Sequence, residues 1–352
     1  TPMSIMIGVG KAAEFGALIR NGDALQQVGK LDVIVLDKTG TVTEGKPSVT
    51  EVSAARDWSR DDVLRLAACL EKVSEHPLAE AIVAAAEDGN LALPAAEKFN
   101  AIAGHGAEAH VDGRKVLLGS RKLMADHDID TSDLEDAARQ AMTRAQTPVY
   151  VAVENVVAGL ISIADAIKPD SREAIQRLQR AGITVALLTG DNQATADAVA
   201  DEIGIKEVFA EVLPEDKAEK IASLQQAGHL VGMVGDGIND APALARADVG
   251  FAIGTGTDVA IESADITLMR GSLQGVVDVV VVSRATVRNI KQNLFGAFIY
   301  NTLGIPIAAG VLFPFVGILL NPMIAGAAMA MSSVTVVSNA NRLRFLKQGA
   351  TP

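Results

Sequence analysis

Three short apolar runs, each followed directly by polar residues, mark the hydrophobic pattern of the chain. They cover residues 33–36, 184–188 and 230–234. Each run is continuous and contains β-branched residues, which is typical of a parallel strand that is buried on both faces. Open α/β sheets carry their chemistry at the carboxyl ends of such strands. The pattern therefore predicts an α/β sheet whose functional residues follow the three runs.

A different pattern fills residues 46–162, between the first run and the second. Short segments at residues 115–118 and 149–153 predict strands, and amphipathic patterns at residues 60–71 and 78–87 predict helices. This mixture interrupts the α/β pattern, so we expect a separate α+β domain inserted after the first strand. Its two connections to the rest of the chain should lie near Lys46 and Asp165.

The carboxyl-terminal region is apolar and free of charge over two stretches, residues 294–315 and 316–341. Each is about long enough to cross a bilayer, and Pro314 and Gly317 mark a turn between them. Basic residues flank the pair on both sides: Arg284, Arg288 and Lys291 before it, and Arg342, Arg344 and Lys347 after it. By the positive-inside rule, both outer ends should be cytoplasmic. Residues 2–18 are also apolar but too short to span a bilayer alone.

Composition narrows the possible functions. The formal net charge of −12 argues against a nucleic-acid partner, which would require a basic face. The single cysteine, Cys69, excludes a disulfide framework, and its helical surroundings favour a core position. The chain begins Thr-Pro, without an initiator Met or a signal peptide, which predicts that it starts inside a longer protein.

The polar residues after the runs supply the parts that phosphoryl transfer requires. Asp37 can act as a nucleophile towards phosphorus, and Thr189 can donate its hydroxyl to phosphate oxygens. Lys217 offers a cation for the same oxygens, while Asp236 and Asp240 offer carboxylates for Mg²⁺. Each residue alone could be an ordinary turn or helix residue, but their common position behind apolar runs favours a shared site.

Three motifs formed by these residues resemble those of P-type cation-transporting ATPases, a branch of the haloacid dehalogenase-like phosphotransferases. They are D-K-T-G-T at residues 37–41, T-G-D at 189–191 and G-D-G-x-N-D at 235–240. The resemblance implies that Asp37 accepts the γ-phosphate of ATP, with Mg²⁺ held by Asp37, the Thr39 carbonyl and Asp236. The other catalytic residues that it implies are Lys38, Thr39, Thr189, Gly190, Asp191, Lys217, Asn239 and Asp240.

Ser-Glu-His-Pro-Leu, at residues 74–78, is similar to a signature of the heavy-metal branch of this family. The resemblance implies that Glu75 and His76 contact the adenine of ATP. It also implies that Gly104, Gly106 and Gly119 let the nucleotide approach the backbone closely. Residues 165–168 resemble the family's hinge between the two domains, with Ala166 in place of a proline.

The apolar stretches contain polar residues that resemble the copper(I) subgroup: Tyr300 and Asn301 in the first, and Met329 with Ser333 in the second. Polar groups within membrane spans are costly and are often functional. A thioether suits a soft ion such as Cu(I) or Ag(I) better than Zn²⁺. Helix–helix packing is the alternative role for these residues.

The resemblance implies ATP-driven copper(I) export through an aspartyl-phosphate, with ATP, Mg²⁺ and transported Cu(I) or Ag(I). A pump of the silver or Cu(II) type, a membrane-anchored phosphatase and a nucleotide-binding paralogue without activity are alternatives. Thr39 disfavours the phosphatase, because those relatives have a second Asp at that place as general acid. The actuator loop Thr-Gly-Glu and the Cys-Pro-Cys motif of heavy-metal pumps are both absent from the sequence. We therefore expect this chain alone to bind Cu(I) weakly and not to complete a transport cycle.

We therefore expect an α/β, haloacid dehalogenase-like phosphorylation domain with an inserted α+β nucleotide-binding domain, plus transmembrane helices. The expected partners are a copper-donor chaperone, membrane lipid and the amino-terminal part of the same pump. The expected location is multi-pass in the cell membrane, with the catalytic domains cytoplasmic. The expected segments are 1–20 (cytoplasmic half of a transmembrane helix), 21–45 with 163–283 (phosphorylation domain), 46–162 (nucleotide-binding domain) and 284–352 (last two transmembrane helices and tail).

Overall fold

The computed structural model describes residues 2–74, 77–102, 104–254, 256–311, 313–316 and 321–349. Glu75, His76 and Gly317, which the sequence analysis singled out, lie outside these residues. The chain forms two compact units. One comprises Thr1–Val35, Glu173–Thr184 and Ala218–Pro352, and the other comprises Leu36–Arg172 and Val185–Lys217.

A seven-stranded sheet has the order β1-β13-β12-β11-β2-β9-β10. Its strands are β1 (Ala17–Ile19), β2 (Val33–Asp37), β9 (Thr184–Leu188), β10 (Glu207–Phe209), β11 (Val231–Gly235), β12 (Val249–Ile253) and β13 (Ile266–Leu268). The pairs β11–β12, β12–β13 and β9–β10 are parallel. Every residue of β2, β11 and β12 is buried, as expected for parallel strands covered on both faces. The three predicted strands therefore form, each within one residue of its predicted bounds.

The amino-terminal segment differs from the prediction. Helix α1 spans Pro2–Glu14, and the chain then turns at Gly16, whose φ of +88° suits a residue without a side chain. Strand β1 follows and pairs antiparallel with β13, with Leu18 opposite Thr267. The prediction that residues 1–20 form half of one transmembrane helix is therefore wrong for residues 15–20, which turn and join the sheet. A three-residue strand is too short to leave a periodic signal in the sequence.

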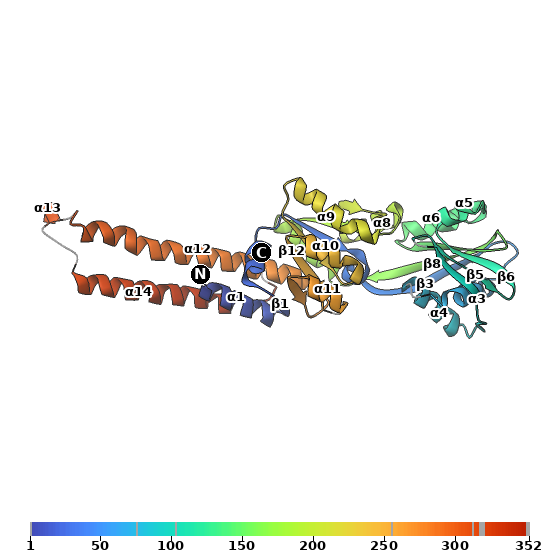
Figure 1. Cartoon of the computed structure of the whole chain (residues 1–352), viewed down its shortest axis with the longest axis horizontal. Helices are drawn as coiled ribbons and strands as arrows, with labels where there is room; N and C mark the ends of the chain where they lie inside the picture. Colours follow the sequence, from blue (N-terminus) through green and yellow to red (C-terminus); the bar gives the residue numbers. More distant parts are fainter. Residues whose placement is uncertain are drawn as a thin grey trace. The chain divides into compact units, whose positions relative to one another are not determined.

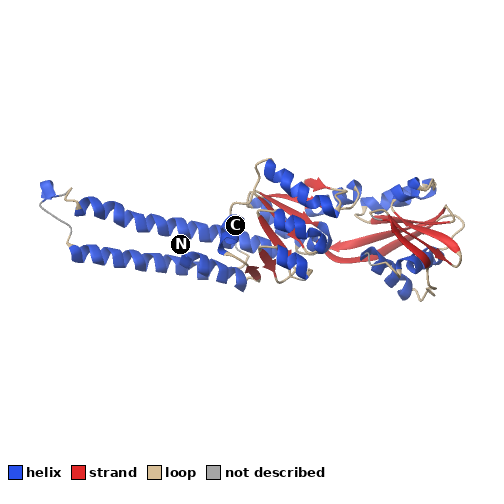
Figure 2. Ribbon diagram, in the orientation of Figure 1, coloured by secondary structure: helices blue, strands red, loops and turns tan. Residues whose placement is uncertain are grey.

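The inserted domain is built on a second sheet of six strands in the order β3-β8-β7-β6-β5-β4, with each neighbouring pair antiparallel. The strands are β3 (Thr43–Ala54), β4 (Glu97–Ile102), β5 (Gly106–Val111), β6 (Arg114–Gly119), β7 (Thr147–Val153) and β8 (Val156–Ile167). Helices α3 (Arg60–Glu71) and α4 (Pro77–Asp88) cover one face, and α5 (Arg121–Asp126) and α6 (Glu135–Thr143) cover the other (Figures 1 and 2). The α+β insert is therefore confirmed.

Strand β7 explains how this sheet holds two cores. Val149, Val151 and Val153 pack into the core under α3 and α4, whereas Tyr150 and Ala152 pack into the opposite core. Successive side chains of a strand point to opposite faces, so a strand with two buried faces needs apolar residues throughout. The continuous apolar run at residues 149–153 follows from this requirement.

The two connections of the insert are paired strands rather than loops. Strands β3 and β8 run antiparallel, with Pro47 opposite Asp165. The carboxylate of Asp165 accepts a hydrogen bond from the Thr43 hydroxyl at 2.5 Å and another from the Lys46 backbone N–H at 3.1 Å. Both predicted connections, near Lys46 and Asp165, thus lie within one hydrogen-bonded ribbon.

Helix α12 (Gln274–Ala308) is continuous for 35 residues and crosses residue 284, where the sequence analysis placed a domain boundary. Its first part is buried and contacts α2 (Gly22–Val28), whereas its second part exposes large apolar side chains such as Phe295 and Phe298. Helix α14 (Pro322–Asn341) lies beside α12 and runs in the opposite direction, with the short helix α13 (Phe313–Val316) between them in the chain (Figures 1 and 2). Among the described residues, one segment, Met323–Phe345, is long and apolar enough to cross a membrane, with a mean hydropathy of 1.4.

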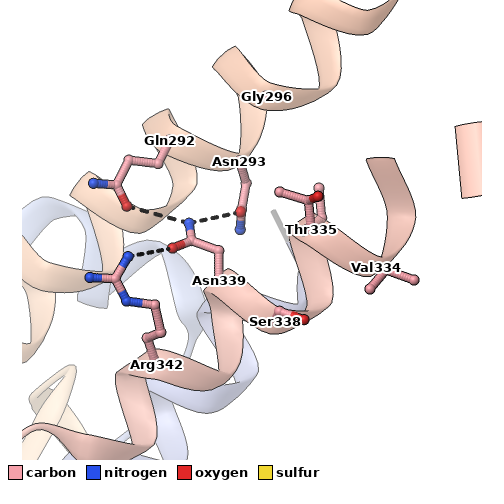
Figure 3. Close-up of a pocket in the computed structure, with 9 residues that line it drawn as sticks. Gln292, Asn293, Gly296, Val334, Thr335, Ser338, Asn339 and Arg342 are labelled. Carbon is pink, nitrogen blue, oxygen red and sulfur yellow. Dashed lines mark hydrogen bonds between the residues drawn. The ribbon is translucent and has the colours of Figure 1, made fainter. Parts of the chain in front are cut away.

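A network of side-chain amides joins α1, α12 and α14. The Ser4 hydroxyl donates to Asn289 at 2.9 Å, and Asn293 donates to both Ser4 and Asn289 at 3.1 Å. From α14, the Asn339 amide donates to Asn293 at 2.9 Å (Figure 3). Ser4, Asn289 and Asn293 are buried, so these bonds satisfy polar groups that would otherwise be costly to bury. The network therefore fixes how the three helices pack.

Candidate functional site

Asp37 is the last residue of β2 and is 5% exposed. The next residues, Lys38–Val42, form a tight turn in which Gly40 has φ +70° and ψ −16°. Gly45 has φ +70° as well, and a side chain there would begin 3.0 Å from the Gly40 Cα. Two glycines are thus required for the chain to reverse directly behind Asp37. The turn holds the Asp37 carboxylate at the carboxyl end of a rigid, buried strand.

Lys217 is the direct partner of Asp37. Its Nζ lies 2.5 Å from the Asp37 Oδ1, and Lys217 is 8% exposed. Residues Pro214–Asp216 form a 3₁₀ turn, and helix α9 (Lys217–Gln226) begins with Lys217 itself. A buried ion pair needs close geometry to offset the loss of hydration, and this pair has it. The ammonium favours the ionised form of Asp37, which is the nucleophilic form.

The motif at residues 189–191 contacts the turn at residues 38–42. Lys38 forms a 2.6 Å ion pair with Asp191, and the Asp191 backbone N–H donates to the Thr189 hydroxyl oxygen at 3.1 Å. Thr189 is buried, whereas Gly190 is exposed. The structure therefore brings together Asp37, Lys38, Asp191 and Lys217 through two ion pairs, with Thr189 held next to Asp191.

Two side chains that support the turn were missed by the sequence analysis. The Lys168 ammonium donates to the Gly40 carbonyl, and the buried Ser171 hydroxyl donates to the Val42 carbonyl at 2.8 Å. Both follow β8 and are far from the turn in the chain. Residues 165–168 had been interpreted only as a hinge, but Asp165 and Lys168 also fix the backbone behind the nucleophile. Nothing in the local sequence pattern indicates these bonds.

Asp236 and Asp240 follow β11, and glycines pack closely around them. A side chain at Gly256 would begin 2.2 Å from the Asp236 carbonyl oxygen, and one at Gly235 would begin 2.7 Å from the Asp240 Cβ. The Thr257 N–H donates to the Asp236 carbonyl at 2.9 Å, and the Asp240 carboxylate accepts from the Gly237 N–H at 3.2 Å. The glycine-rich stretch around Gly256 therefore has a structural role in holding Asp236. Asn239, in contrast, is exposed.

The carboxylates suit a hard divalent cation. Asp37, Asp236 and Asp240 each offer one oxygen, and these three oxygens lie within 4.8 Å of one another. Carboxylate oxygens are the protein ligands that Mg²⁺ prefers. The donor set therefore fits Mg²⁺, and it adds Asp240 to the ligands implied by the resemblance.

In the insert, strand packing gives a second reason for glycine at two of the three positions predicted to lie beside the nucleotide. Gly106 in β5 and Gly119 in β6 are opposite one another. A side chain at Gly106 would begin 2.0 Å from the Leu118 carbonyl oxygen, and one at Gly119 would begin 2.2 Å from the His105 carbonyl oxygen. Close strand packing therefore requires glycine at both positions. Gly104 has φ +72°, and a side chain there would come no closer than 3.8 Å to the nearest side chain, that of Leu213. Of the three, Gly104 alone has room beside its backbone.

Glu71 ends helix α3 just before residues 75 and 76. It is 7% exposed, and its Oε2 atom has no hydrogen-bond partner among the described residues. Burial raises the pKa of the Glu71 carboxyl, and a hydrogen bond with Ser74 acts in the opposite direction. The sequence pattern does not mark Glu71 as unusual, because a glutamate at the end of an amphipathic helix is usually solvated.

The predicted copper residues lie on α12 and α14. Asn301 donates to the Ala297 carbonyl at 3.2 Å, and Ser333 donates to the Met329 carbonyl at 3.2 Å. Both bonds are to carbonyls of their own helices, four residues back. Met329 is 54% exposed, and Tyr300 is half-buried. Asn301, Met329 and Ser333 therefore present their side chains at the surface of the helix pair.

Comparison with known proteins agrees with this geometry. Residues 31–248 match the family "haloacid dehalogenase-like hydrolase". The chain is 52% identical over 344 residues to "Copper-transporting ATPase 2" of Rhizobium meliloti (strain 1021), an alignment covering 98% of this chain and 42% of that protein. It is 49% identical over 349 residues to the "Silver exporting P-type ATPase" of Salmonella typhimurium, covering 99% of this chain and 42% of that protein.

A solved structure gives the same result at the level of the fold. The crystal structure of a zinc-transporting PIB-type ATPase in the E2.Pi state superimposes with a TM-score of 0.73 and 38% identity, covering 97% of this chain and 55% of that chain. The chain thus spans about half the length, or less, of the proteins it matches. The chain belongs to the haloacid dehalogenase-like hydrolase family, and over nearly its whole length it is homologous to copper-transporting P-type ATPases.

Proposed function

We propose that this chain carries the ATP-binding, phosphorylation and last-two-helix portion of an ATP-driven copper(I) exporter that works through an aspartyl-phosphate at Asp37. The observation that carries the proposal is the buried 2.5 Å ion pair between Lys217 and Asp37, at the turn that follows β2. The names of the relatives, copper-transporting and silver exporting ATPases, support the choice of ion.

The chemistry follows from the residues around Asp37. One Asp37 oxygen pairs with Lys217, and the other attacks the γ-phosphorus of ATP in line with the bond to the β-phosphate oxygen. That bond breaks, ADP leaves, and an acyl-phosphate bond, which is a mixed anhydride, forms between the Asp37 carboxylate and the phosphorus. Lys217 and the Thr189 hydroxyl stabilise the negative charge on the transferring oxygens. Mg²⁺ held by Asp37, the Thr39 carbonyl, Asp236 and Asp240 would supply further charge neutralisation when bound.

Thr39 distinguishes this reaction from that of a phosphatase of the same family. It occupies the place of the general acid in those relatives, and a threonine hydroxyl cannot supply a proton as a carboxylic acid does. Thr39 is also exposed, outside the buried pair of Asp37 and Lys217. We therefore expect the aspartyl-phosphate to persist rather than to be hydrolysed at once.

ATP would reach Asp37 from the insert. We assign adenine recognition to Glu75 and His76, with the Gly104 backbone beside the nucleotide. The proposed arrangement makes the seven-stranded sheet and its helices the phosphorylation domain, and the inserted six-stranded sheet and its helices the nucleotide-binding domain.

The test of phosphorylation uses the purified chain in detergent with Mg²⁺ and ATP labelled at the γ-phosphate. We expect a label that survives acid and is released by hydroxylamine, because an acyl phosphate reacts with that nucleophile and a serine or threonine phosphate does not. ATP labelled at the α-phosphate is the control and should leave no label. A label that resists hydroxylamine, or none at all, would contradict the proposal.

For the ion, we propose that Tyr300, Asn301, Met329 and Ser333 contribute to a Cu(I) site, with Ag(I) as a second substrate. The Met329 thioether gives the site its preference for soft ions, because hydroxyl and amide oxygens do not discriminate in this way. The proposed setting is a multi-pass protein of the cell membrane with cytoplasmic catalytic domains. Its proposed partners are membrane lipid, a copper-donor chaperone and the amino-terminal part of the pump.

Replacing Met329 by alanine is expected to abolish the weak Cu(I) binding of the chain, since it removes the one soft donor of the proposed set. Competition with a chromophoric Cu(I) chelator in detergent measures the loss. Met331→Ala is the matched control, because Met331 is exposed on the same helix two residues further on. Equal binding by both variants and by the unchanged chain would remove Met329 from the site.

A further inference from the structure

A groove between α12 and α14 remains outside the proposed copper and phosphorylation sites. It has a volume of about 680 Å³ and lies where the two helices approach the basic ends of the pair. Figure 3 shows Gln292 and Asn293 on α12 facing Asn339 on α14, with Arg342 beside them. The lining continues along the helices through Gly296 and Val334. One end of the groove is therefore polar and cationic, and the other is apolar.

The polar end of the groove is lined by side-chain amides and by one guanidinium. The Asn339 amide donates to Asn293 at 2.9 Å and to Gln292 at 3.3 Å, which orients all three side chains (Figure 3). Arg342 donates one of its N–H groups to the side-chain amide oxygen (Oδ1) of Asn339 at 3.2 Å. Among the described residues, Arg342 forms no ion pair. A guanidinium has five N–H donors, so most of its capacity for an anion is unused.

The charge of the surrounding chain favours an anionic occupant. No Asp or Glu follows Asp278 in the sequence, whereas Arg284, Arg288, Lys291, Arg342, Arg344 and Lys347 do. The chain as a whole has a net charge of −12, so the carboxyl-terminal region is opposite in sign to the chain as a whole. An occupant with a negative head and an apolar body matches both ends of the groove.

We infer that the groove binds one anionic phospholipid, with its phosphate at Arg342 and the Gln292 amide and an acyl chain along Gly296 and Val334. Basic pockets between membrane helices at the cytoplasmic side are suited to such headgroups. The inference rests on the proposed membrane location of α12 and α14. Beyond that location, the inference assigns a specific lipid contact to one end of the helix pair α12 and α14, which also carries the proposed ion site.

The experiment titrates the purified chain, in a neutral detergent, with dioctanoyl phosphatidylglycerol and counts bound lipid by native mass spectrometry. We expect Arg342→Gln to weaken binding at least tenfold. Arg344→Gln is the matched control, because Arg344 is an exposed cation of the same tail that does not line the groove. Loss of one surface charge should weaken binding only about fivefold or less, the equivalent of about 1 kcal/mol. Equal effects of the two substitutions would indicate diffuse attraction and overturn the site.

A second pair of variants tests the apolar end without changing charge. Gly296→Leu should fill the groove and weaken lipid binding about tenfold. Apart from the chain neighbours and the backbone of its own helix, no atom lies within 4 Å of an added Cβ, so the helix can accept the side chain. Gly304→Leu, equally unhindered on the same helix but outside the groove, should leave binding unchanged. If Gly296→Leu binds lipid as the unchanged chain does, the acyl chain does not occupy the groove and the inference fails.

Two further probes decide which chemistry is recognised. Dioctanoyl phosphatidylcholine should bind at least tenfold more weakly than phosphatidylglycerol, and equal binding would overturn the anionic preference. Inorganic phosphate at the same concentration should not displace phosphatidylglycerol, and displacement would identify a site for free anions instead. The assay contains no nucleotide and no copper, so its failure would leave the proposed phosphorylation of Asp37 untouched.

Discussion

Asp37→Asn is expected to abolish the acid-stable phosphoenzyme completely. An amide oxygen is a very poor nucleophile, and the substitution also removes the negative charge that pairs with Lys217 at 2.5 Å. The side chains have nearly the same volume, so the turn at residues 38–42 and the packing of β2 should be retained. The measurement is incorporation of γ-phosphate label in the presence of Mg²⁺, with circular dichroism to confirm folding.

Asp32→Asn is the matched control, because Asp32 immediately precedes the same strand at its opposite end and should not contact ATP. It should incorporate label at the level of the unchanged chain. Label that persists in Asp37→Asn would assign the phosphate to another residue and reject the proposed intermediate.

Lys217→Gln is expected to lower the rate of phosphoenzyme formation by about 10²–10³, the usual effect of removing one donor that stabilises a transition-state charge. Two causes act in the same direction. The transferring phosphate loses a cation, and the buried Asp37 loses the partner that favours its ionised form. Breaking a buried ion pair from one side typically costs about 3–5 kcal/mol, so a lower melting temperature is also expected.

The matched control for this prediction is Lys220→Gln, one turn further along α9. It should leave the rate of labelling within twofold of the unchanged chain, because Lys217 is the residue that forms the ion pair with Asp37. A rapid quench of the labelling reaction separates the two variants. Similar rates for Lys217→Gln and the unchanged chain would show that the ion pair is structural only.

The predicted elements with the strongest periodic signal form where they were expected. Strand β9 and helix α3 have the predicted bounds, residues 184–188 and 60–71, because each is set by local residues: a buried apolar run in one case and an amphipathic pattern capped by Ser59 in the other. The motif residues Asp37, Lys38, Asp191 and Lys217 were also found from sequence. Asp37, Lys38 and Asp191 follow apolar runs, whereas Lys217 begins a helix, and positions of both kinds can be located in a single sequence.

Other features depend on partners that are distant in sequence. Lys168 bonds to Gly40 across 128 residues, and no local pattern marks that pair. The packing requirement at Gly106 and Gly119 also appears only when the register is known, because side chains there would meet the carbonyl of Leu118 in β6 and that of His105 just before β5. Their role beside ATP stays a prediction. Strand β1 was missed since three residues carry too little information. The boundary at residue 284 was drawn from charge, whereas helix formation continues through Arg284 and Arg288 without interruption.

The continuity of α12 has a mechanical consequence. A helix of 35 residues is about 50 Å long, at 1.5 Å per residue. Its backbone hydrogen bonds resist bending over most of this length, up to the last turns, where Pro306 has no N–H to donate. Its first turns pack on α2, and Tyr300 and Asn301 lie near its far end. A tilt of about 5° about the packed end would move the far end by about 4 Å, from the same helical rise. The helix is therefore a lever, by which a small rotation at its packed end becomes a displacement larger than a metal–ligand bond.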